Sequence, residues 1–314
     1  MLLVAGSLTI DRIYRCERMP EEGGTVCGSA SVHVGGYGGI EALAALRSGA
    51  KARLAAAIGD DEDGRLLRNL LSQHGLSGSA LSVCADAPTG SSSTLLDDSG
   101  YYWRVDALAA NALFEAGPEV EQQLDSAKML LCQCDANPRS VHRLMSAARA
   151  RRIPTVLHAA PARPEALKML APLADVVVAD ENGFSDLVRL FHPSGLGDFT
   201  GEQIHALSDV RLGEMCRATV AGDLVILLGA RGAFVSERDG SHKLVGDATG
   251  PVSRSYYCCA QETFVGALCA RILDGDALKQ AVRYAIVASS MPGPMGGQDA
   301  IPRWGDVLAR MERC

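Results

Sequence analysis

The sequence lacks any apolar run near the roughly 20 residues that a membrane-spanning helix needs. Its opening segment, residues 1–6, is too short for a signal peptide and has no basic start. Acidic residues outnumber basic ones, the formal net charge is −7, and no basic stripe is interleaved with aromatic side chains. These absences predict a cytoplasmic protein that binds neither membrane nor nucleic acid.

Metal-ligand spacing is missing too, although the chain has ten cysteines. Most of them are expected to be small buried side chains, and Cys132 and Cys134 alternate within a strand-like run, which puts them on one face of a sheet. Cys258 and Cys259 differ by position, because a thiol at a helix N-terminus can be reactive. No metal site built from protein side chains alone is predicted.

Two glycine fingerprints are absent. The glycine-rich turn at 35–39 is not followed by the Gly-Lys-Ser/Thr of a Walker loop, and the first strand is not followed by Gly-x-Gly-x-x-Gly. The second absence leaves a Rossmann-type oxidoreductase as only a third option for the function.

What the chain does have is an alternation of strand-like and helix-like stretches over 314 residues, 47% of them hydrophobic and 21% charged. The clearest strand candidates are residues 129–134, 154–158, 175–179 and 224–228, with helical stretches such as 140–151 and 206–220 between them. Such βαβ spacing predicts a mostly parallel sheet covered by helices on both faces, which is a three-layer α/β sandwich.

Two further segments have a β pattern with turns of their own. Residues 9–34 contain a Pro- and Gly-rich turn, and residues 91–106 read as a hairpin around 98–100. Together they predict a small β lid. The remaining ranges, 1–8, 35–90 and 107–314, form the main domain.

Polar residues stand directly after several predicted strands. Thr9 and Asp11 follow the first strand, and Asp135 and His158 follow two later ones. Because ligands bind outside the carboxyl ends of parallel strands, these residues are pocket candidates. The acidic run at 60–63 is interpreted as the solvated start of a helix, in preference to a cation site.

Near the end of the chain, an irregular stretch leads into a helix in which Phe264, Ala267 and Leu268 recur at helical spacing. The first turn of a helix has unpaired N–H groups and partial positive charge, so it can hold an anion, and Glu262 lies at that end. This pairs a carboxylate base with an anion site. On the residues alone, the simpler interpretation of Glu262 as a partner of the helix dipole is favoured.

The chain resembles the ribokinase (PfkB) family of sugar kinases along nearly all its length. The family's Asp-Thr-x-Gly-Ala-Gly-Asp-x-Phe-x-Gly motif is matched in its second half by residues 262–266, its Gly-Gly-x-x-x-Asn-x-Ala pattern by 35–42, and its Thr-x-Gly-x-x-Gly segment by 227–232. The resemblance implies a ribokinase-like fold and an ATP- and magnesium-dependent kinase. Its substrate would be a sugar, a sugar acid or a nucleoside-like alcohol.

The resemblance also implies residue roles. Glu262 would be the base, with an anion hole formed by the amides of Cys259, Ala260 and Gln261. The substrate would be held by Thr9, Asp11, Gly35, Gly36, Asn111 and Asp135. The nucleotide side would consist of Asp180, Gly229, Arg231 and Gly232. The family further implies a homodimer through the lid, which apolar Tyr101 and Trp103 would suit.

The motifs depart from the family pattern where the chemistry lies. Glu stands in place of the catalytic Asp at 262, and Cys259 and Gln261 replace two glycines, which requires negative φ at both if no strain is to result. Ile40 takes the place of an Asn that binds a hydroxyl, so Glu41 or a different substrate would have to compensate.

On the nucleotide side, residues 180–183 replace an Asn-x-x-Glu motif, although Asp180, Glu181 and Asn182 can still order a hydrated magnesium ion. Because these departures cluster in the chemical residues, a second hypothesis stays open: a catalytically impaired descendant that binds sugar or nucleotide in a regulatory role.

Overall fold

Most strands of the central sheet are short apolar runs that are buried on both faces. Among the residues that the computed structural model describes (1–192, 199–246, 259–291 and 297–313), nine strands pair in the order β13-β12-β11-β10-β9-β8-β1-β4-β5. They are β1 (Leu2–Ala5), β4 (Ala52–Gly59), β5 (Ser77–Cys84), β8 (Met129–Cys132), β9 (Thr155–His158), β10 (Val176–Asp180), β11 (Asp223–Leu227), β12 (Ala233–Ser236) and β13 (His242–Val245). Cys258 lies outside the described residues.

The pairing is parallel from β5 to β11 and antiparallel at the edge formed by β12 and β13. Alternation along each strand divides the interior into two cores: Leu2 and Val4 of β1 face one, Leu3 and Ala5 the other. A parallel sheet needs such apolar runs because helices cover both of its faces.

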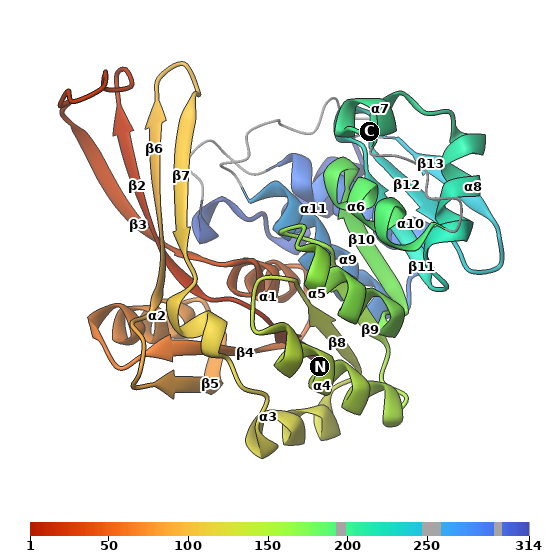
Figure 1. Ribbon diagram of the computed structural model, residues 1–314, viewed down its shortest axis with the longest axis horizontal. Coiled ribbons are helices and arrows are strands. Elements are labelled where there is room, and N and C mark those ends of the chain that lie inside the picture. Colours follow the sequence, from red (N-terminus) through yellow and green to blue (C-terminus); the bar gives the residue numbers. More distant parts are fainter. Residues whose placement is uncertain (193–198, 247–258, 292–296, 314) are drawn as a thin grey trace.

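Helices form a layer on each side of this sheet (Figure 1). One layer consists of α1 (Tyr37–Arg47), α2 (Glu62–Gln73), α9 (Ala260–Asp274), α10 (Leu278–Ser290) and α11 (Trp304–Met311). The other consists of α3 (Pro118–Gln122), α4 (Pro138–Ala150), α5 (Pro164–Leu170), α6 (Glu181–Phe191), α7 (Gly201–Ala206) and α8 (Asp209–Thr219). The predicted three-layer sandwich with a mostly parallel sheet is confirmed.

Two predicted boundaries are wrong. The helix expected over 206–220 begins only at Asp209, because Ser208 is extended and its hydroxyl caps α8 by accepting a hydrogen bond from the N–H of Arg211. The strand expected over 129–134 ends at Cys132, so Cys132 and Cys134 do not share a strand, although both are buried.

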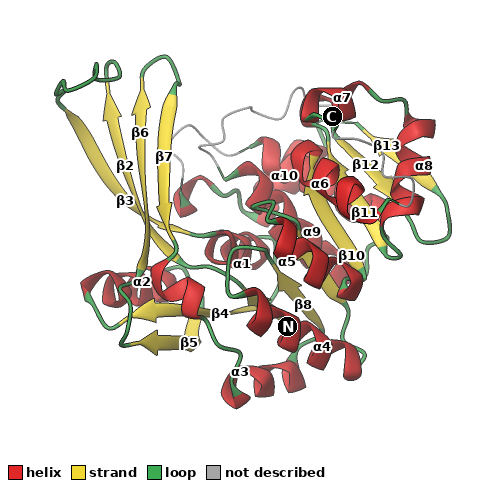
Figure 2. Cartoon of the chain, in the orientation of Figure 1, coloured by secondary structure: helices red, strands yellow, loops and turns green. Residues whose placement is uncertain are grey.

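A second sheet projects from the main body beside β4 and α1 (Figures 1 and 2). Within the described part of the chain it has four strands in the order β3-β2-β6-β7: β2 (Thr9–Cys16), β3 (Gly28–Gly35), β6 (Gly90–Asp97) and β7 (Tyr102–Ala107). These strands come from the two segments assigned to the lid, and β6 and β7 form the hairpin expected around 98–100. We call this sheet the lid sheet.

The described ranges contain no helix with both the length and the apolar character needed to cross a bilayer. They also contain no group of three or more His, Cys, Asp or Glu side chains arranged to hold a metal ion.

The acidic turn at 60–63 joins the lid sheet to the main domain. The carboxylate of Asp61 caps α2 by accepting from the N–H of Gly64 at 2.8 Å, and it also accepts from the N–H and hydroxyl of Thr89 at 2.7 and 2.6 Å. Thr89 immediately precedes β6. Burial alone would raise the pKa of Asp61, yet the hydrogen bonds from Thr89 and Gly64 outweigh it and lower the pKa.

We therefore expect Asp61→Ala to lower the free energy of unfolding by about 1–3 kcal/mol, since it removes a helix cap and leaves the N–H of Thr89 without its acceptor. Urea unfolding at pH 7 measures this. Because the pKa is lowered in the fold, the stabilisation is present above about pH 4 and is lost as the pH falls further.

Asp60→Ala is the matched control, because the Asp60 side chain is 78% exposed and only approaches Arg65 at 3.9 Å. A change below about 0.5 kcal/mol is expected there. Equal effects of the two substitutions on the free energy of unfolding would contradict the role of Asp61 in joining the lid sheet to the main domain.

Candidate active site

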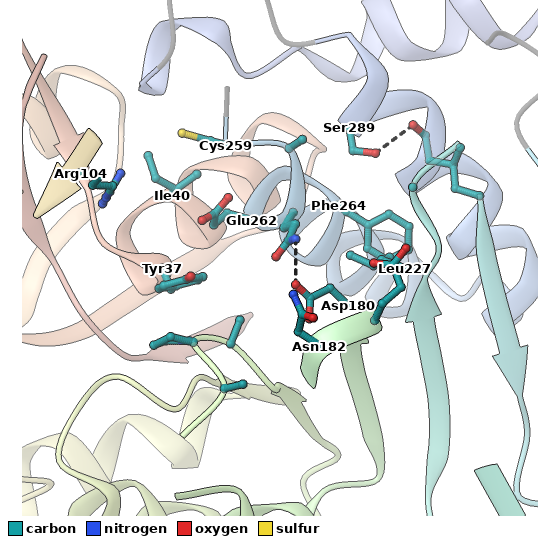
Figure 3. Close-up of a pocket in the computed structure, with 18 of the residues that line it drawn as sticks. Tyr37, Ile40, Arg104, Asp180, Asn182, Leu227, Cys259, Glu262, Phe264 and Ser289 are labelled. Atoms are coloured by element: carbon teal, nitrogen blue, oxygen red, sulfur yellow. Dashed lines mark hydrogen bonds between the residues drawn. The ribbon is translucent and has the colours of Figure 1, made fainter. Parts of the chain in front are cut away.

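One cavity of about 810 Å³ opens at the carboxyl ends of the parallel strands, between the main sheet and the lid sheet. It is lined by residues that follow β9, β10 and β11, by the first turns of α1 and α9, and by lid strands β2 and β7. Figure 3 shows Tyr37, Ile40 and Arg104 at one end, Asp180, Asn182 and Leu227 at the other, and Glu262 between them. The two ends differ in chemistry.

The N-terminus of α9 is aimed at the middle of the cavity. Cys259, Ala260, Gln261 and Glu262 all line it. Ala260, Gln261 and Glu262 are the first three residues of the helix, so their N–H groups have no acceptor within it, and the first intrahelical bond runs from the N–H of Thr263 to the carbonyl of Cys259 at 2.9 Å. A base and a set of amide donors therefore face the same space.

Cys259 adopts a left-handed backbone conformation, with φ 56° and ψ 34°. A residue with a side chain pays on the order of 1–2 kcal/mol there, whereas glycine does not. Gln261 lies within α9 and has no such strain; its amide donates to Asp180 at 3.4 Å. Of the two glycine replacements, only Cys259 keeps a glycine-like backbone.

At the lid end, Asp11 is held by two neighbours. The Thr9 hydroxyl donates to its carboxylate at 2.7 Å, and the guanidinium of Arg104 approaches it at 3.4 Å. Gly35 fits against this carboxylate, because a Cβ there would lie 1.9 Å from an Asp11 oxygen. Gly36 has φ 80° and lines the cavity at the start of α1.

Arg104 was not predicted as a site residue. It lies in β7 between Tyr102 and Asp106, and all three line the cavity, as strict alternation in a strand requires. Burial disfavours its charge, but Asp11 and Asp106 outweigh burial and raise its pKa. The alternation was the signal that could have identified it.

Asn111 and Asp135 do not line the cavity. Asn111 is fully buried, accepts from the N–H of Leu8 at 2.9 Å, and donates to the carbonyls of Leu8 and Leu108 at 2.9 and 3.0 Å. Asp135 is buried and accepts from the Ser7 hydroxyl, and burial raises its pKa to about 6. Both residues support the turn that follows β1, and substrate contact by either stays a prediction.

At the other end of the cavity, Asp180, Gly229 and Gly232 are lining residues, together with Glu181 and Asn182. Asp180 also caps α6, accepting from the N–H of Gly183 at 2.7 Å. These carboxylate and amide oxygens are of the kind that a hydrated magnesium ion takes, so the donor set fits the metal expected from the sequence.

Arg231 turns away from the cavity. Its guanidinium donates to the carbonyls of His205 and Leu207, the latter at 3.1 Å, and to Asp209 at 3.1 Å. Its side chain thus fixes the segment that connects α7 to α8, and contact with a nucleotide stays a prediction.

Comparison with known proteins gives the family. The profile described as "pfkB family carbohydrate kinase" matches residues 1–292. The chain is 24% identical over 317 residues to the ribokinase of Haemophilus influenzae, covering all of this chain and 99% of that one. It is 23% identical over 299 residues to the ribokinase of Schizosaccharomyces pombe, covering 92% and 91%.

Solved structures agree on the fold. The ribokinase of Arabidopsis thaliana, complexed with ribose and ATP, superposes with a TM-score of 0.81 at 19% identity over 98% of this chain and 97% of that one. The ribokinase of Cryptococcus neoformans in complex with ADP gives 0.80 at 22% identity, over 98% and 99%. Since the family profile spans most of the sequence, the chain belongs to the pfkB family of carbohydrate kinases.

Proposed function

We propose that the protein transfers the γ-phosphoryl group of ATP to a hydroxyl group of a small sugar or sugar-like molecule, with Glu262 as the base. The observation that carries this is the N-terminus of α9, where Glu262 and the first amides of the helix line one cavity between the lid sheet and the strand ends. The Arabidopsis relative with ribose and ATP supports ribose as the first substrate to try.

In this mechanism Glu262 takes the proton of the substrate hydroxyl. The oxygen of that hydroxyl bonds to the γ-phosphorus of ATP, and ADP leaves. The amides of Cys259, Ala260 and Gln261 donate to the transferring group. A base contributes typically ~10²–10⁴-fold, and one lost donor to a developing oxyanion costs on the order of 10²–10³-fold. Phosphoryl transfer depends mostly on such positioning and charge stabilisation.

The lid end orients the substrate. Asp11, fixed by Thr9, accepts from sugar hydroxyls, and Arg104 donates from β7, two strands away in the lid sheet. The Gly35–Gly36 turn lets the sugar approach the backbone closely. Asn111 and Asp135 stabilise the turn after β1 that lies beneath this end of the cavity.

At the end of the cavity away from the lid sheet, the residues that follow β10 and β11 hold the nucleotide. They include Gly229, Gly232 and Asp180, which lies at the N-terminus of α6. Asp180, Glu181 and Asn182 would hold magnesium through its water shell, and the bound ion would neutralise charge on the phosphates. Arg231 supports this end by anchoring the segment after α7.

A second candidate function is binding of sugar or nucleotide without catalysis. Two observations favour it: the left-handed backbone at Cys259, which a side chain makes costly, and the apolar Ile40 in the cavity wall. ADP release with magnesium ATP and a panel of sugars, sugar acids and nucleosides separates the two functions. Turnover supports the kinase, whereas thermal shifts on ligand addition without turnover support the binding protein.

We also propose that two copies associate through the outer face of the lid sheet. Trp103 and Val105 of β7 are 66% and 71% exposed, and Trp103 lies in register with Leu95 of β6 and, one strand further, with Tyr14 of β2. An apolar row of this kind, which crosses three strands and ends at the edge strand β7, suits a self-complementary contact.

Glu262→Gln is expected to lower kcat by about 10²–10⁴-fold, because it removes the base while keeping size and hydrogen bonding. Thermal unfolding should be unchanged. Glu214→Gln on α8, where the carboxylate is 49% exposed, is the matched control and should keep full activity. Retained turnover in Glu262→Gln would remove this residue from the mechanism.

The backbone at Cys259 predicts opposite outcomes for two substitutions. Cys259→Gly should keep or raise kcat, since glycine adopts φ 56° without strain. Cys259→Val should lower kcat on the order of 10²-fold, because a β-branched residue disfavours this conformation and the amide would move. Steady-state kinetics of both variants test this, and a Cys259→Val enzyme with wild-type kcat would refute it.

The double variant Trp103→Lys/Val105→Lys is expected to be monomeric at concentrations where the wild type is a dimer. Light scattering after size exclusion gives both masses. Val210→Lys on α8, where the side chain is 64% exposed, is the control and should leave the dimer intact. Identical masses for the wild type and the double variant would count against the lid interface.

A further inference from the structure

Beneath the cavity lies an ion pair that none of the proposed catalytic steps uses. Glu41 of α1 and His158 at the end of β9 are fully buried, and their Oε1 and Nδ1 atoms are 2.6 Å apart. Gln133, also fully buried, donates to the other oxygen of Glu41. From the sequence, His158 is a pocket candidate and Glu41 is one alternative to compensate for Ile40, but neither lines the cavity.

On one side, this pair supports the substrate end. Tyr37 lines the cavity, and its ring meets the His158 ring edge-on, with centroids 5.6 Å apart and planes at 71°. Tyr37 and Glu41 are four residues apart on α1 and so share one face of that helix. Among the described residues, the bond to Glu41 is the one hydrogen bond of the His158 ring, whose Nε2 has no partner there.

On the other side, the pair supports the catalytic helix. A Cβ on Gly266 would lie 2.3 Å from the carbonyl oxygen of Glu41, so α9 and α1 touch at Glu41. Gly266 is one turn after Glu262 on α9. Glu41 thus binds His158 through its side chain and contacts α9, the helix that carries Glu262, through its backbone.

We propose that the Glu41–His158 ion pair is a positioning element, which holds the Tyr37 ring and the helix carrying Glu262 in register across the α1–α9 contact. This inference rests on the phosphoryl transfer proposed above. Neither partner touches substrate; the pair acts through Tyr37 and α9. A displacement of reacting groups by about 1 Å can cost on the order of 10²-fold in rate.

The charged groups around the pair set its pH dependence. Burial raises the pKa of Glu41 to about 7, although His158 acts in the opposite direction. Burial also acts to lower the pKa of His158, but the carboxylate of Glu41 outweighs burial and raises that pKa. Glu262 and Asp180 also raise the pKa of His158, and the thiols of Cys132, Cys134 and Cys269 nearby have raised pKa values and stay uncharged. Asp135 is a further acidic neighbour of His158.

The sign follows from these directions. Both pKa values are raised in the fold, so the pair holds its shared proton more tightly than the free side chains would and loses it as the pH rises. A buried carboxylate without a partner then remains beside α9. Positioning should weaken toward alkaline pH.

The test compares His158→Asn, Glu41→Gln and the double variant Glu41→Gln/His158→Asn in the ADP-release assay from pH 6 to 9. His158→Asn leaves Glu41 without its cation, and kcat should fall by about 10²-fold while KM for ATP changes less than about threefold. The double variant replaces the ion pair by two neutral amides and should recover at least about tenfold of that loss. The ratio of its kcat to that of the wild type should rise with pH.

Thr219→Val is the control for loss of a buried hydrogen bond, because the Thr219 hydroxyl donates to the carbonyl of Met215 at 2.6 Å on α8. It should lower the melting temperature and leave kcat unchanged. If the pair variants behave as Thr219→Val does, or if the double variant is no better than His158→Asn, the positioning role is overturned.

Failure of the proposed function remains distinguishable from failure of this inference. A wild type without turnover on any substrate would reject the kinase, and the pair is then followed by NMR of the Tyr37 ring. Glu41→Gln should shift the Tyr37 resonances, because Glu41 reaches Tyr37 through His158. Tyr37 resonances unchanged in that variant would overturn the inference without any assay of activity.

Discussion

The contact between α1 and α9 is the constraint on which the rest of the site depends. It is close because Gly266 has no side chain: a Cβ would meet the backbone at Glu41 and Ala45. The two helices bring Gly36 and Tyr37 at the start of one, and Cys259 to Glu262 at the start of the other, to the same cavity. The N-terminus of α9 supplies backbone donors, whereas the N–H groups of Tyr37 and Gly39 at the start of α1 donate to Ser7, and the sheet beneath fixes the separation of the two helices. A larger residue at 266 would separate the two halves of the site.

Most of the fold could be predicted from the sequence because it rests on periodicity. Apolar runs, helical spacing and turn residues each give a local signal, and a sheet with helices on both faces is what their alternation allows. The prediction failed where the local signal was weak. Residues 206–220 have helical composition throughout, and the break depends on the extended backbone at Ser208, which composition does not reveal.

The site was predictable in its backbone and less so in its side chains. Asp11, Gly36, Asp180 and the 259–262 segment line the cavity, since their position follows from the topology. The orientation of a long side chain does not. Arg231 lies in the glycine-containing turn at 229–232 yet anchors the segment after α7, and Arg104, which no motif marks, enters the cavity from the lid sheet.

The proposed activity requires that the chain, with its altered motif, still transfers a phosphoryl group to a hydroxyl group. The most direct measurement is a ³¹P NMR spectrum of the products formed from magnesium ATP and ribose, followed by the other sugars of the panel. A kinase gives a new phosphomonoester resonance that grows together with ADP in equal amounts. ADP accompanied only by inorganic phosphate, or ATP left intact with every sugar, would contradict the proposed activity.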